Sequence, residues 1–295
     1  MDNVEYIERL PGLPDRPEDS HKGMFGRILV VGGSPGMLGA VSLTTMSAMR
    51  SGAGLVTFAT SALIQQSVAM LCECATSVRL DCDEKGNLDS AAISQVVQAS
   101  RDVDIVAVGP GFGLGEVQQE IIQALLRTEK PIIIDADGIN NLCLLFDWQH
   151  IRSAPVILTP HPGELSSLTG YSVEEIQANR EQVAVETVRQ FAKPYENIPL
   201  ILALKGANTI VTDGTKVFVN STGNPGLATA GSGDVLTGII AGLSQQGVDL
   251  FDATCLATFI HGRAGDLAAE ELTQVSMIAT DVMNYIGDAI AEIFG

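Results

Sequence analysis

The residues best suited to chemistry in this sequence are Gly231, Ser232, Gly233 and Asp234. An amphipathic helical pattern follows directly. The N–H groups at a helix start have no partners within the helix and lie at the positive end of its dipole. Because glycine lets a ligand approach the backbone closely, this stretch predicts an anion hole for phosphate. The carboxylate of Asp234 at its mouth suits a general base, although a helix cap with a glycine turn is the alternative.

Composition limits the partners of this chain of 295 residues. Its formal net charge of −18 argues against nucleic acid and anionic membranes as partners. There is no run of about 18 apolar residues, the length a membrane-spanning helix requires. The acidic, proline-bearing start indicates neither a signal nor a transit peptide. Five cysteines without CxxC spacing indicate reduced thiols and a cytoplasmic protein.

Short apolar runs alternate with helical patterns along the chain. Strands are predicted at 27–31, 55–59, 76–80, 104–109, 131–135, 155–159 and 200–204, with a hairpin of 210–212 and 216–219. Helices are predicted at about 40–51, 61–70, 89–100, 116–127, after 234 and at 252–270. Continuous rather than alternating apolar runs indicate burial on both faces, and so an α/β fold with a largely parallel sheet and helices on both sides. We expect a single domain over 1–295, with 1–26 as an irregular N-terminal arm.

Glycine-rich or acidic loops follow several of the predicted strands. They span 32–40, 109–115, 135–140, 160–164 and 205–209. Ligands in parallel sheets bind beyond the carboxyl ends of the strands, so we expect these loops to converge on one rim. The first loop matches neither G-x-G-x-x-G nor G-x-x-x-x-G-K-[ST], which makes a Rossmann dinucleotide site or a P-loop a poor interpretation.

The order of these motifs resembles the NAD(P)H-hydrate dehydratase family of the ribokinase-like superfamily over nearly the whole chain. The matching pieces are SHKG at 20–23, VVGGSPGMLGA at 30–40, VGPGFG at 108–113, DADGIN at 135–140, TPHPGEL at 159–165, LKGANT at 204–209 and NPGLATAGSGDVLTGII at 224–240. The resemblance implies a ribokinase-like fold and an ADP-dependent (S)-NAD(P)H-hydrate dehydratase, a carbon–oxygen lyase of metabolite repair. Such an enzyme phosphorylates the ring hydroxyl of hydrated NADH or NADPH and eliminates phosphate, giving NAD(P)H, AMP and phosphate.

The resemblance also implies roles for individual residues. Asp234 would be the catalytic base, and the hydrated nicotinamide nucleotide would contact Ala40, Gly113, His161 and Asp234. ADP would be held by Lys205, Gly206, Ala207, Asn208, Thr209 and Gly233. Asn208 and Thr209 open the predicted hairpin, so a turn-forming role is the alternative for them. His161 is a candidate for removing the ring C–H proton in the last step.

Two departures from related sequences bear on the site. Related kinases carry Asn-x-x-Glu where this chain has His161 and Glu164, and their glutamate orders Mg²⁺ through water. Glu164 is therefore either an indirect magnesium group or an acid at a helix start, favoured by the dipole. Relatives that read GGTGD differ from AGSGD at 230–234, but serine keeps the hydroxyl, and we expect no loss of function.

Other interpretations share parts of this site. A vitamin-precursor kinase of the same superfamily would use the same aspartate and anion hole, and a non-enzymatic nucleotide sensor would use neither for turnover. Glycine loops at 36–40 and 109–113 favour the dehydratase, since they suit a second phosphate-bearing ligand. The resemblance further implies small-molecule substrates, a homo-oligomer (a tetramer) and a functional link to an NAD(P)H-hydrate epimerase. Gly238 and Gly242 on one predicted helix could pack inside the fold or against a second subunit.

Overall fold

The computed structural model describes residues 4–295, in which ten strands form one sheet. The strands are β1 (Glu5–Tyr6), β2 (Arg27–Val31), β3 (Leu55–Ser61), β4 (Thr76–Leu80), β5 (Ile105–Val108), β6 (Ile132–Ile134), β7 (Val156–Leu158), β8 (Leu200–Leu204), β9 (Ile210–Thr212) and β10 (Lys216–Val219). Their order is β1-β10-β9-β8-β7-β6-β5-β2-β3-β4. Only β9 runs antiparallel to its neighbours, which confirms the predicted parallel sheet and its hairpin.

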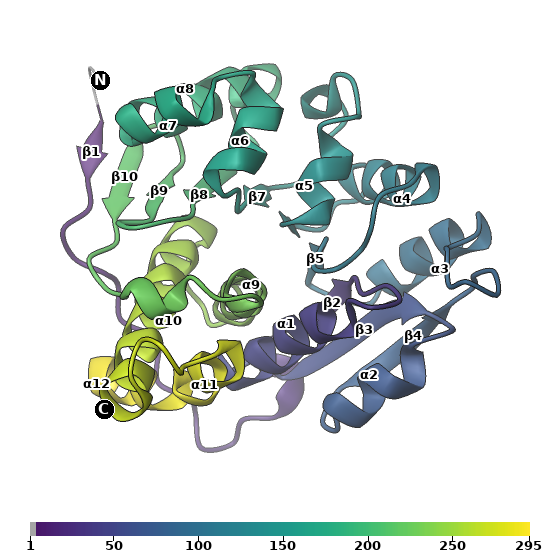
Figure 1. The fold of residues 1–295 in the computed structure, drawn as a ribbon, viewed down its shortest axis with the longest axis horizontal. Coiled ribbons are helices and arrows are strands. Elements are labelled where there is room, and N and C mark those ends of the chain that lie inside the picture. Colours follow the sequence, from purple (N-terminus) through teal and green to yellow (C-terminus); the bar gives the residue numbers. More distant parts are fainter. Residues whose placement is uncertain (1–3) are drawn as a thin grey trace.

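Helices cover both faces of the sheet (Figure 1). One face carries α1 (Leu38–Arg50), α2 (Gln65–Leu71), α9 (Ser232–Leu243), α10 (Leu250–Leu272), α11 (Ala279–Asn284) and α12 (Ile286–Phe294). The other carries α3 (Ala91–Ser100), α4 (Glu116–Leu126), α5 (Asp137–Leu142), α6 (Pro162–Thr169), α7 (Val173–Ala178) and α8 (Arg180–Ala192). Within residues 4–295, no helix combines the length and the apolar character needed to cross a membrane.

Strand β2 shows why the central strands are apolar along most of their length. Its Ile28 and Val30 join the hydrophobic core on one face, whereas Leu29 and Val31 join the core on the other. Successive side chains of a strand point to opposite faces, so a strand covered on both sides has no position to leave polar.

Two predictions about local structure need correction. The arm at 1–26 is not irregular throughout, because Glu5–Tyr6 pairs in parallel with β10 and Lys22–Phe25 forms a short 3-10 helix; residues 1–3 lie outside the described residues. Six helices, α5–α8, α11 and α12, were not predicted. Five of them span only 6 to 9 residues, which is too short for a clear helical pattern. The sixth, α8, has 13 residues and buries one apolar face, which was not recognised in the sequence.

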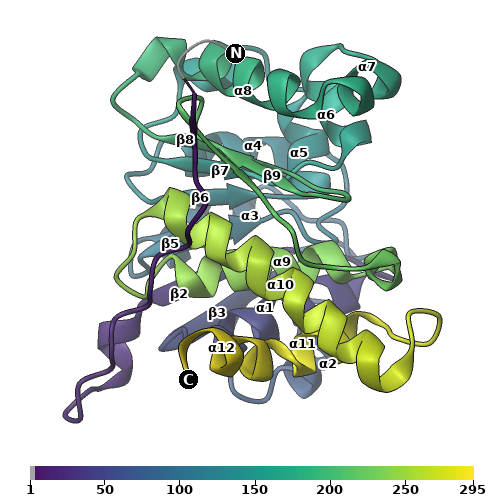
Figure 2. The ribbon, with the colours of Figure 1, turned by 90° about the vertical axis from the view of Figure 1, so that its left-hand side faces the viewer.

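Glycines bring α9 into backbone contact with α1. A Cβ atom at Gly238 would lie 2.3 Å from the carbonyl oxygen of Thr44, and one at Gly242 would lie 2.6 Å from that of Ala48. These two glycines therefore pack inside the fold. Figure 2 shows α10 lying in front of α9 and α1, so α9 is held between other helices and the sheet.

Replacing Gly238 tests this close approach. We expect Gly238→Ala to lower the free energy of unfolding by about 1–3 kcal/mol, because the new methyl group has no room beside α1. Gly287→Ala on α12 is the matched control: its methyl group meets nothing within 4 Å, and alanine should raise helix stability by up to about 1 kcal/mol. Urea unfolding measures both, and equal effects at the two sites would contradict the packing described here.

Candidate active site

The start of α9 presents N–H groups without protein partners. Gly231 is its N-cap residue and has a φ of 90°, a backbone conformation that favours glycine. The amide of Ser232 donates to the carbonyl oxygen of Thr229 at 3.4 Å. Within residues 4–295, the amides of Gly231, Gly233 and Asp234 have no acceptor. The unpaired set thus differs from the predicted anion hole by one member, because the amide of Asp234 replaces that of Ser232.

Asp234 lies in the first turn of α9 with its side chain half-buried. Its carbonyl oxygen accepts a hydrogen bond from Thr44 Oγ1 at 3.0 Å, which ties this turn to α1. Desolvation raises the pKa of Asp234 to about 7; the charge of Asp135 also raises it, whereas that of Lys205 lowers it. A carboxylate with this pKa can accept a proton near neutral pH and hold it, as a general base must.

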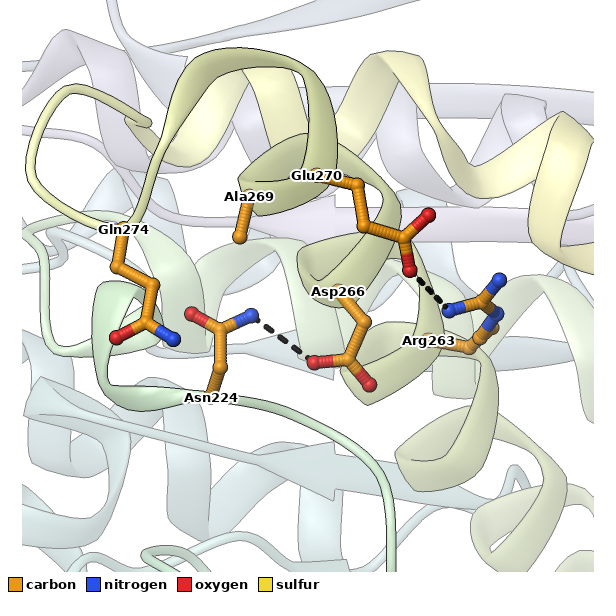
Figure 3. Close-up of a pocket in the computed structure, with 6 residues that line it drawn as sticks. All are labelled: Asn224, Arg263, Asp266, Ala269, Glu270 and Gln274. Carbon is orange, nitrogen blue, oxygen red and sulfur yellow. Dashed lines mark hydrogen bonds and ion pairs between the residues drawn. The ribbon is translucent and has the colours of Figure 1, made fainter.

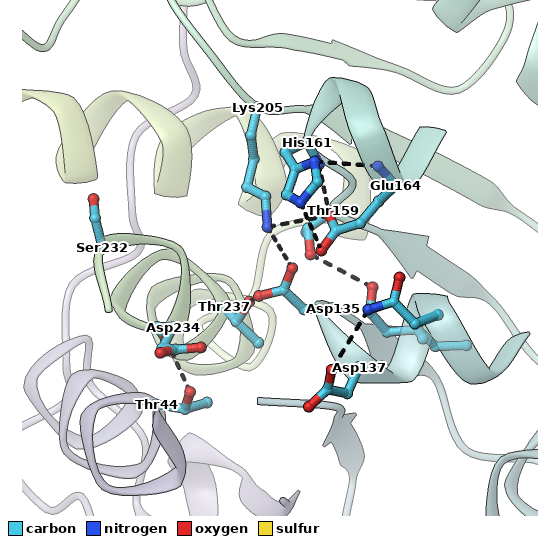
Figure 4. A network of polar contacts seen from close by, with 12 residues as sticks. Thr44, Asp135, Asp137, Thr159, His161, Glu164, Lys205, Ser232, Asp234 and Thr237 are labelled. Carbon is cyan, nitrogen blue, oxygen red and sulfur yellow. Dashed lines mark hydrogen bonds and ion pairs between the residues drawn. The ribbon is translucent and has the colours of Figure 1, made fainter. Parts of the chain in front are cut away.

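Lys205 carries the positive charge of the site. It follows β8, and its Nζ lies 2.5 Å from Asp135 Oδ1, after β6, and 3.8 Å from Glu164 Oε2 on α6 (Figure 4). Burial lowers the pKa of Lys205, but the charges of Asp135 and Glu164 outweigh it, so its pKa is raised and the lysine stays charged. A Cβ atom at Gly233 would lie 3.3 Å from Nζ, which places the ammonium group beside the unpaired amides.

Asp135 couples this lysine to α9. Its Oδ2 accepts a hydrogen bond from Thr237 Oγ1 at 2.6 Å, while its Oδ1 pairs with Lys205. Thr237 is three residues after Asp234, so both lie on neighbouring turns of one helix face. The buried Asp135 therefore fixes the position of Lys205 relative to the first turn of α9.

His161 and Glu164 form a capping box at the start of α6. The amide of His161 donates to Glu164 Oε2 at 2.7 Å, and the amides of Gly163 and Glu164 donate to His161 Nδ1 at 3.0 and 3.1 Å. The Nε2 atom, 3.4 Å from Glu164 Oε1, is then the nitrogen that carries the proton of a neutral ring. His161 can therefore donate to a ligand, but its one acceptor nitrogen is occupied. This geometry argues against the predicted removal of the C–H proton by His161.

Glu164 fits only an indirect role toward magnesium. Burial raises its pKa, and Oε2 is already bound by the amide of His161. Within the described residues, no group of three or more His, Cys, Asp and Glu side chains could hold a metal ion. Mg²⁺ commonly keeps several waters and binds through phosphate oxygens, so the residues suit an ion carried by a nucleotide. The contacts of Glu164 with the amide of His161 are those of an acid at a helix start, which is one of its two interpretations.

The predicted contacts of the nicotinamide nucleotide lie near Asp234. Ala40, in the first turn of α1, accepts a hydrogen bond at its carbonyl oxygen from Thr44 Oγ1, which also reaches the carbonyl of Asp234. The amide of Gly113 donates to Asp137 Oδ2 at 2.9 Å. A Cβ atom at Gly111, in the same loop as Gly113, would lie 3.0 Å from Cβ of Ala40. The structure thus brings Ala40, Gly113 and Asp234 to one part of the rim.

The turn at 205–209, predicted to hold ADP, joins β8 to β9. Asn208 has a φ of 54°, and Thr209 Oγ1 donates to the carbonyl of Gly206 at 3.0 Å, so both residues also form the turn itself. The side chain of Arg180, on α8, supports the turn from behind: its Nη2 donates to the carbonyls of Leu204 and Lys205 at 3.0 and 3.3 Å. Ala207 and Gly206 lie between these anchors, and their contact with a nucleotide stays a prediction.

A polar pocket of about 400 Å³ marks where the segment leading to the anion hole is attached to α10 (Figure 3). Asp266 Oδ2 accepts from the amide of Gly223 at 2.9 Å, and Oδ1 accepts from Asn224 Nδ2 at 3.0 Å. Arg263, on the same helix, pairs with Glu270 at 3.0 Å. These contacts fix the chain before it enters the glycine loop, so the loop starts from a defined place.

Several residues of the site were not predicted. Each of them holds another residue of the site in place. Thr237 binds Asp135, Arg180 binds the turn after β8, and His261 Nε2 lies 2.9 Å from the carbonyl oxygen of Ser232. Thr237 could have been found from its spacing of three residues from Asp234. His261 lies within an apolar helical pattern, where a polar side chain is a weak signal, and nothing in the sequence links Arg180 to the turn.

Comparisons with known proteins agree on one family. The profile of a family described as NAD(P)H-hydrate dehydratase matches residues 28–288. The bifunctional NAD(P)H-hydrate repair enzyme of Moorella thermoacetica is 39% identical over 277 residues, covering 93% of this chain and 51% of that protein. The ADP-dependent (S)-NAD(P)H-hydrate dehydratase of Neisseria meningitidis is 38% identical, covering 86% of this chain and 81% of that protein. The chain spans about half the length of the bifunctional relatives it matches.

Solved structures agree with the sequence comparisons. The ADP/ATP-dependent NAD(P)H-hydrate dehydratase of Bacillus subtilis, co-crystallised with ATP and Mg²⁺, superposes with a TM-score of 0.81 at 28% identity. The match covers 97% of this chain and 99% of that one. Ribokinase structures share the fold at lower identity, so the prediction of a ribokinase-like α/β fold is confirmed.

Two substitutions near Asp234 should shift the pKa of its carboxyl group in opposite directions. Lys205→Met should raise the pKa of Asp234 above about 7, because it removes a positive charge that lowers this pKa. Asp137→Asn should lower the pKa, because it removes a negative charge that raises it. Carbon-13 NMR of the carboxyl groups against pH measures both shifts. Shifts of the same sign would contradict this account of the electrostatics.

Proposed function

Because the chain belongs to the NAD(P)H-hydrate dehydratase family, we propose that it is an ADP-dependent (S)-NAD(P)H-hydrate dehydratase. One observation carries the proposal: the carboxylate of Asp234 lies in the same helical turn as three unpaired amides, with the ammonium group of Lys205 beside them. Amides and a lysine bind phosphate, and a carboxylate with a pKa near 7 activates an alcohol beside it. These parts are what phosphorylation of a ring hydroxyl requires.

In the first step, the ring hydroxyl attacks the terminal phosphorus of ADP while Asp234 accepts its proton. The bond from that phosphorus to the bridging oxygen breaks, and AMP leaves. The amides of Gly231, Gly233 and Asp234 and the charge of Lys205 stabilise the negative charge on the transferring group. Because Lys205 is held by Asp135, it is in place before the nucleotide binds and needs little reorganisation.

In the second step, the lone pair of the ring nitrogen expels phosphate by breaking the new carbon–oxygen bond. Loss of the neighbouring C–H proton restores the double bond and gives NADH or NADPH. The side chain of His161 is 57% exposed, so its Nε2–H, which lies beside Glu164 Oε1, can also donate to phosphate or ribose oxygens of the hydrated nucleotide. His161 thus orients the substrate rather than removing the proton.

Two ligands are assigned to two parts of the rim. The hydrated nucleotide contacts Ala40, Gly113 and His161, and ADP lies along the turn at 205–209. The Neisseria meningitidis relative is named ADP-dependent and the Bacillus subtilis structure was obtained with ATP and Mg²⁺, which supports a nucleotide with bound magnesium here. Magnesium would be held by the phosphates, with Glu164 reaching it through water, and would supply additional positive charge.

The wider setting of the protein follows from the same family. We propose a cytoplasmic homo-oligomer that acts together with an NAD(P)H-hydrate epimerase. The relatives named bifunctional repair enzymes, of which this chain spans about half, support such a link between two activities. The negative charge of the chain, −18, fits small-molecule substrates bound by local amides and a lysine rather than by a basic surface.

Replacing Asp234 tests the activity and its base together. The wild-type protein with hydrated NADH and ADP should restore the absorbance of reduced nicotinamide, and Asp234→Asn should lower that rate at least ~10²-fold while ADP still binds. Asp102→Asn, an exposed surface carboxylate, is the matched control and should leave the rate unchanged. Absence of NADH recovery by the wild type, together with phosphorylation of a vitamin precursor, would favour the kinase instead.

The pH dependence of the reaction gives a second test. Since the base must be ionised and its pKa is about 7, kcat/KM should rise with pH up to about 7 and then level off. The terminal phosphate of ADP also titrates, so the wild type is compared with Asp137→Asn. That variant should move the midpoint to lower pH while the titration of ADP stays the same. A midpoint that does not move would assign the profile to the nucleotide and not to Asp234.

A further inference from the structure

The helix α10 places a histidine against the residue that opens α9. His261 Nε2 lies 2.9 Å from the carbonyl oxygen of Ser232 and 3.1 Å from its Oγ. His261 is half-buried, one turn before Gly265 and Asp266, which anchor the segment entering the glycine loop. Helix α10 therefore touches the anion-hole segment at its beginning, near residue 223, and at its end, at residue 232.

The carbonyl contact decides which ring nitrogen of His261 carries the proton. A carbonyl oxygen only accepts hydrogen bonds, so an unprotonated Nε2 at 2.9 Å would set two acceptors against each other. Nε2 is therefore the donor. Desolvation, with a smaller contribution from the charge of Lys205, lowers the pKa of His261 to about 4 against the opposing effect of its hydrogen bond to Ser232, so the ring is a neutral donor near neutral pH.

This assignment determines what the hydroxyl of Ser232 can do. Because Nε2 carries a proton, Ser232 Oγ can only accept from it, and the hydrogen of the hydroxyl has no other acceptor within the described residues. The side chains of Ser232 and Asp234 leave the start of α9 in different directions (Figure 4). Among the described residues, the hydrogen of this hydroxyl is thus left without a protein acceptor at the first residue of α9, on a different side from the Asp234 carboxylate.

We propose that His261 is a positioning residue that fixes Ser232, so that the Ser232 hydroxyl donates to the terminal phosphate of ADP. The proposal rests on the proposed function, because it takes ADP to be the ligand of the anion hole. His261 contacts no reacting atom. It acts by holding both oxygens of Ser232 and leaving one hydrogen, that of the hydroxyl, available to the ligand.

The test compares ADP with AMP, which lacks the terminal phosphate. By calorimetry, Ser232→Ala and His261→Leu should each weaken ADP binding about tenfold, as expected for a lost hydrogen bond to a charged group, and change AMP binding less than about threefold. His261→Gln, whose side-chain amide can donate to the carbonyl, should recover most of the ADP affinity. His150→Leu, an exposed histidine on another element, is the control and should change neither.

The double variant separates positioning from general loss of structure. If His261 acts through the hydroxyl, Ser232→Ala with His261→Leu should bind ADP as weakly as either single variant. Additive losses of ADP affinity in the double variant, or equal losses of affinity for ADP and AMP, would overturn the role of His261. Neither result would contradict the proposed dehydratase activity. A wild-type protein that does not bind ADP at all would overturn the proposed function and this inference together. Ordinary melting temperatures for all variants are required for the comparison.

Discussion

The N–H groups of Gly231, Gly233 and Asp234 are the constraint on which the rest of the structure depends. Amides left unpaired within a protein cost free energy until an anion or water satisfies them, so such a group is kept where a ligand uses it. The side chain of Asp234 complicates the site, because a bound phosphate repels a carboxylate. The raised pKa of Asp234 and the charge of Lys205 both reduce this repulsion, and they are properties of the fold rather than of the loop.

Each contact of α9 holds this arrangement from a different direction. Gly238 lets α1 approach to backbone distance, and Thr44 then reaches the first turn of α9. On the side of the sheet, Thr237 binds Asp135, which in turn holds Lys205. These contacts come from segments far apart in the sequence, and only the parallel sheet, with β6 and β8 on either side of β7, brings their loops together. The fold thus supplies a preorganised charge distribution, the main source of rate enhancement in sites of this type.

The sequence was enough to predict every strand except β1, the parallel character of the sheet and the rim where the loops meet, because continuous apolar runs and strand-end loops are local patterns. It placed Asp234 and Lys205 at the same rim through family resemblance. Features that depend on tertiary contacts were missed. The edge strand at Glu5–Tyr6 is only two residues long, which is too short to give a pattern. The capping box formed by His161 and Glu164 can be recognised only when the first residue of α6 is known. The partner of the Ser232 amide, three residues earlier in the chain, likewise depends on how the loop turns.

The most direct measurement of the central claim is a crystal structure of the Asp234→Asn variant with ADP and hydrated NADH bound. The terminal phosphate should lie on the amides at the start of α9, beside Lys205. The side chain of residue 234 should lie within about 3 Å of the ring hydroxyl, the reach of a general base. A terminal phosphate elsewhere on the protein, with no anion at those amides, would contradict the central claim.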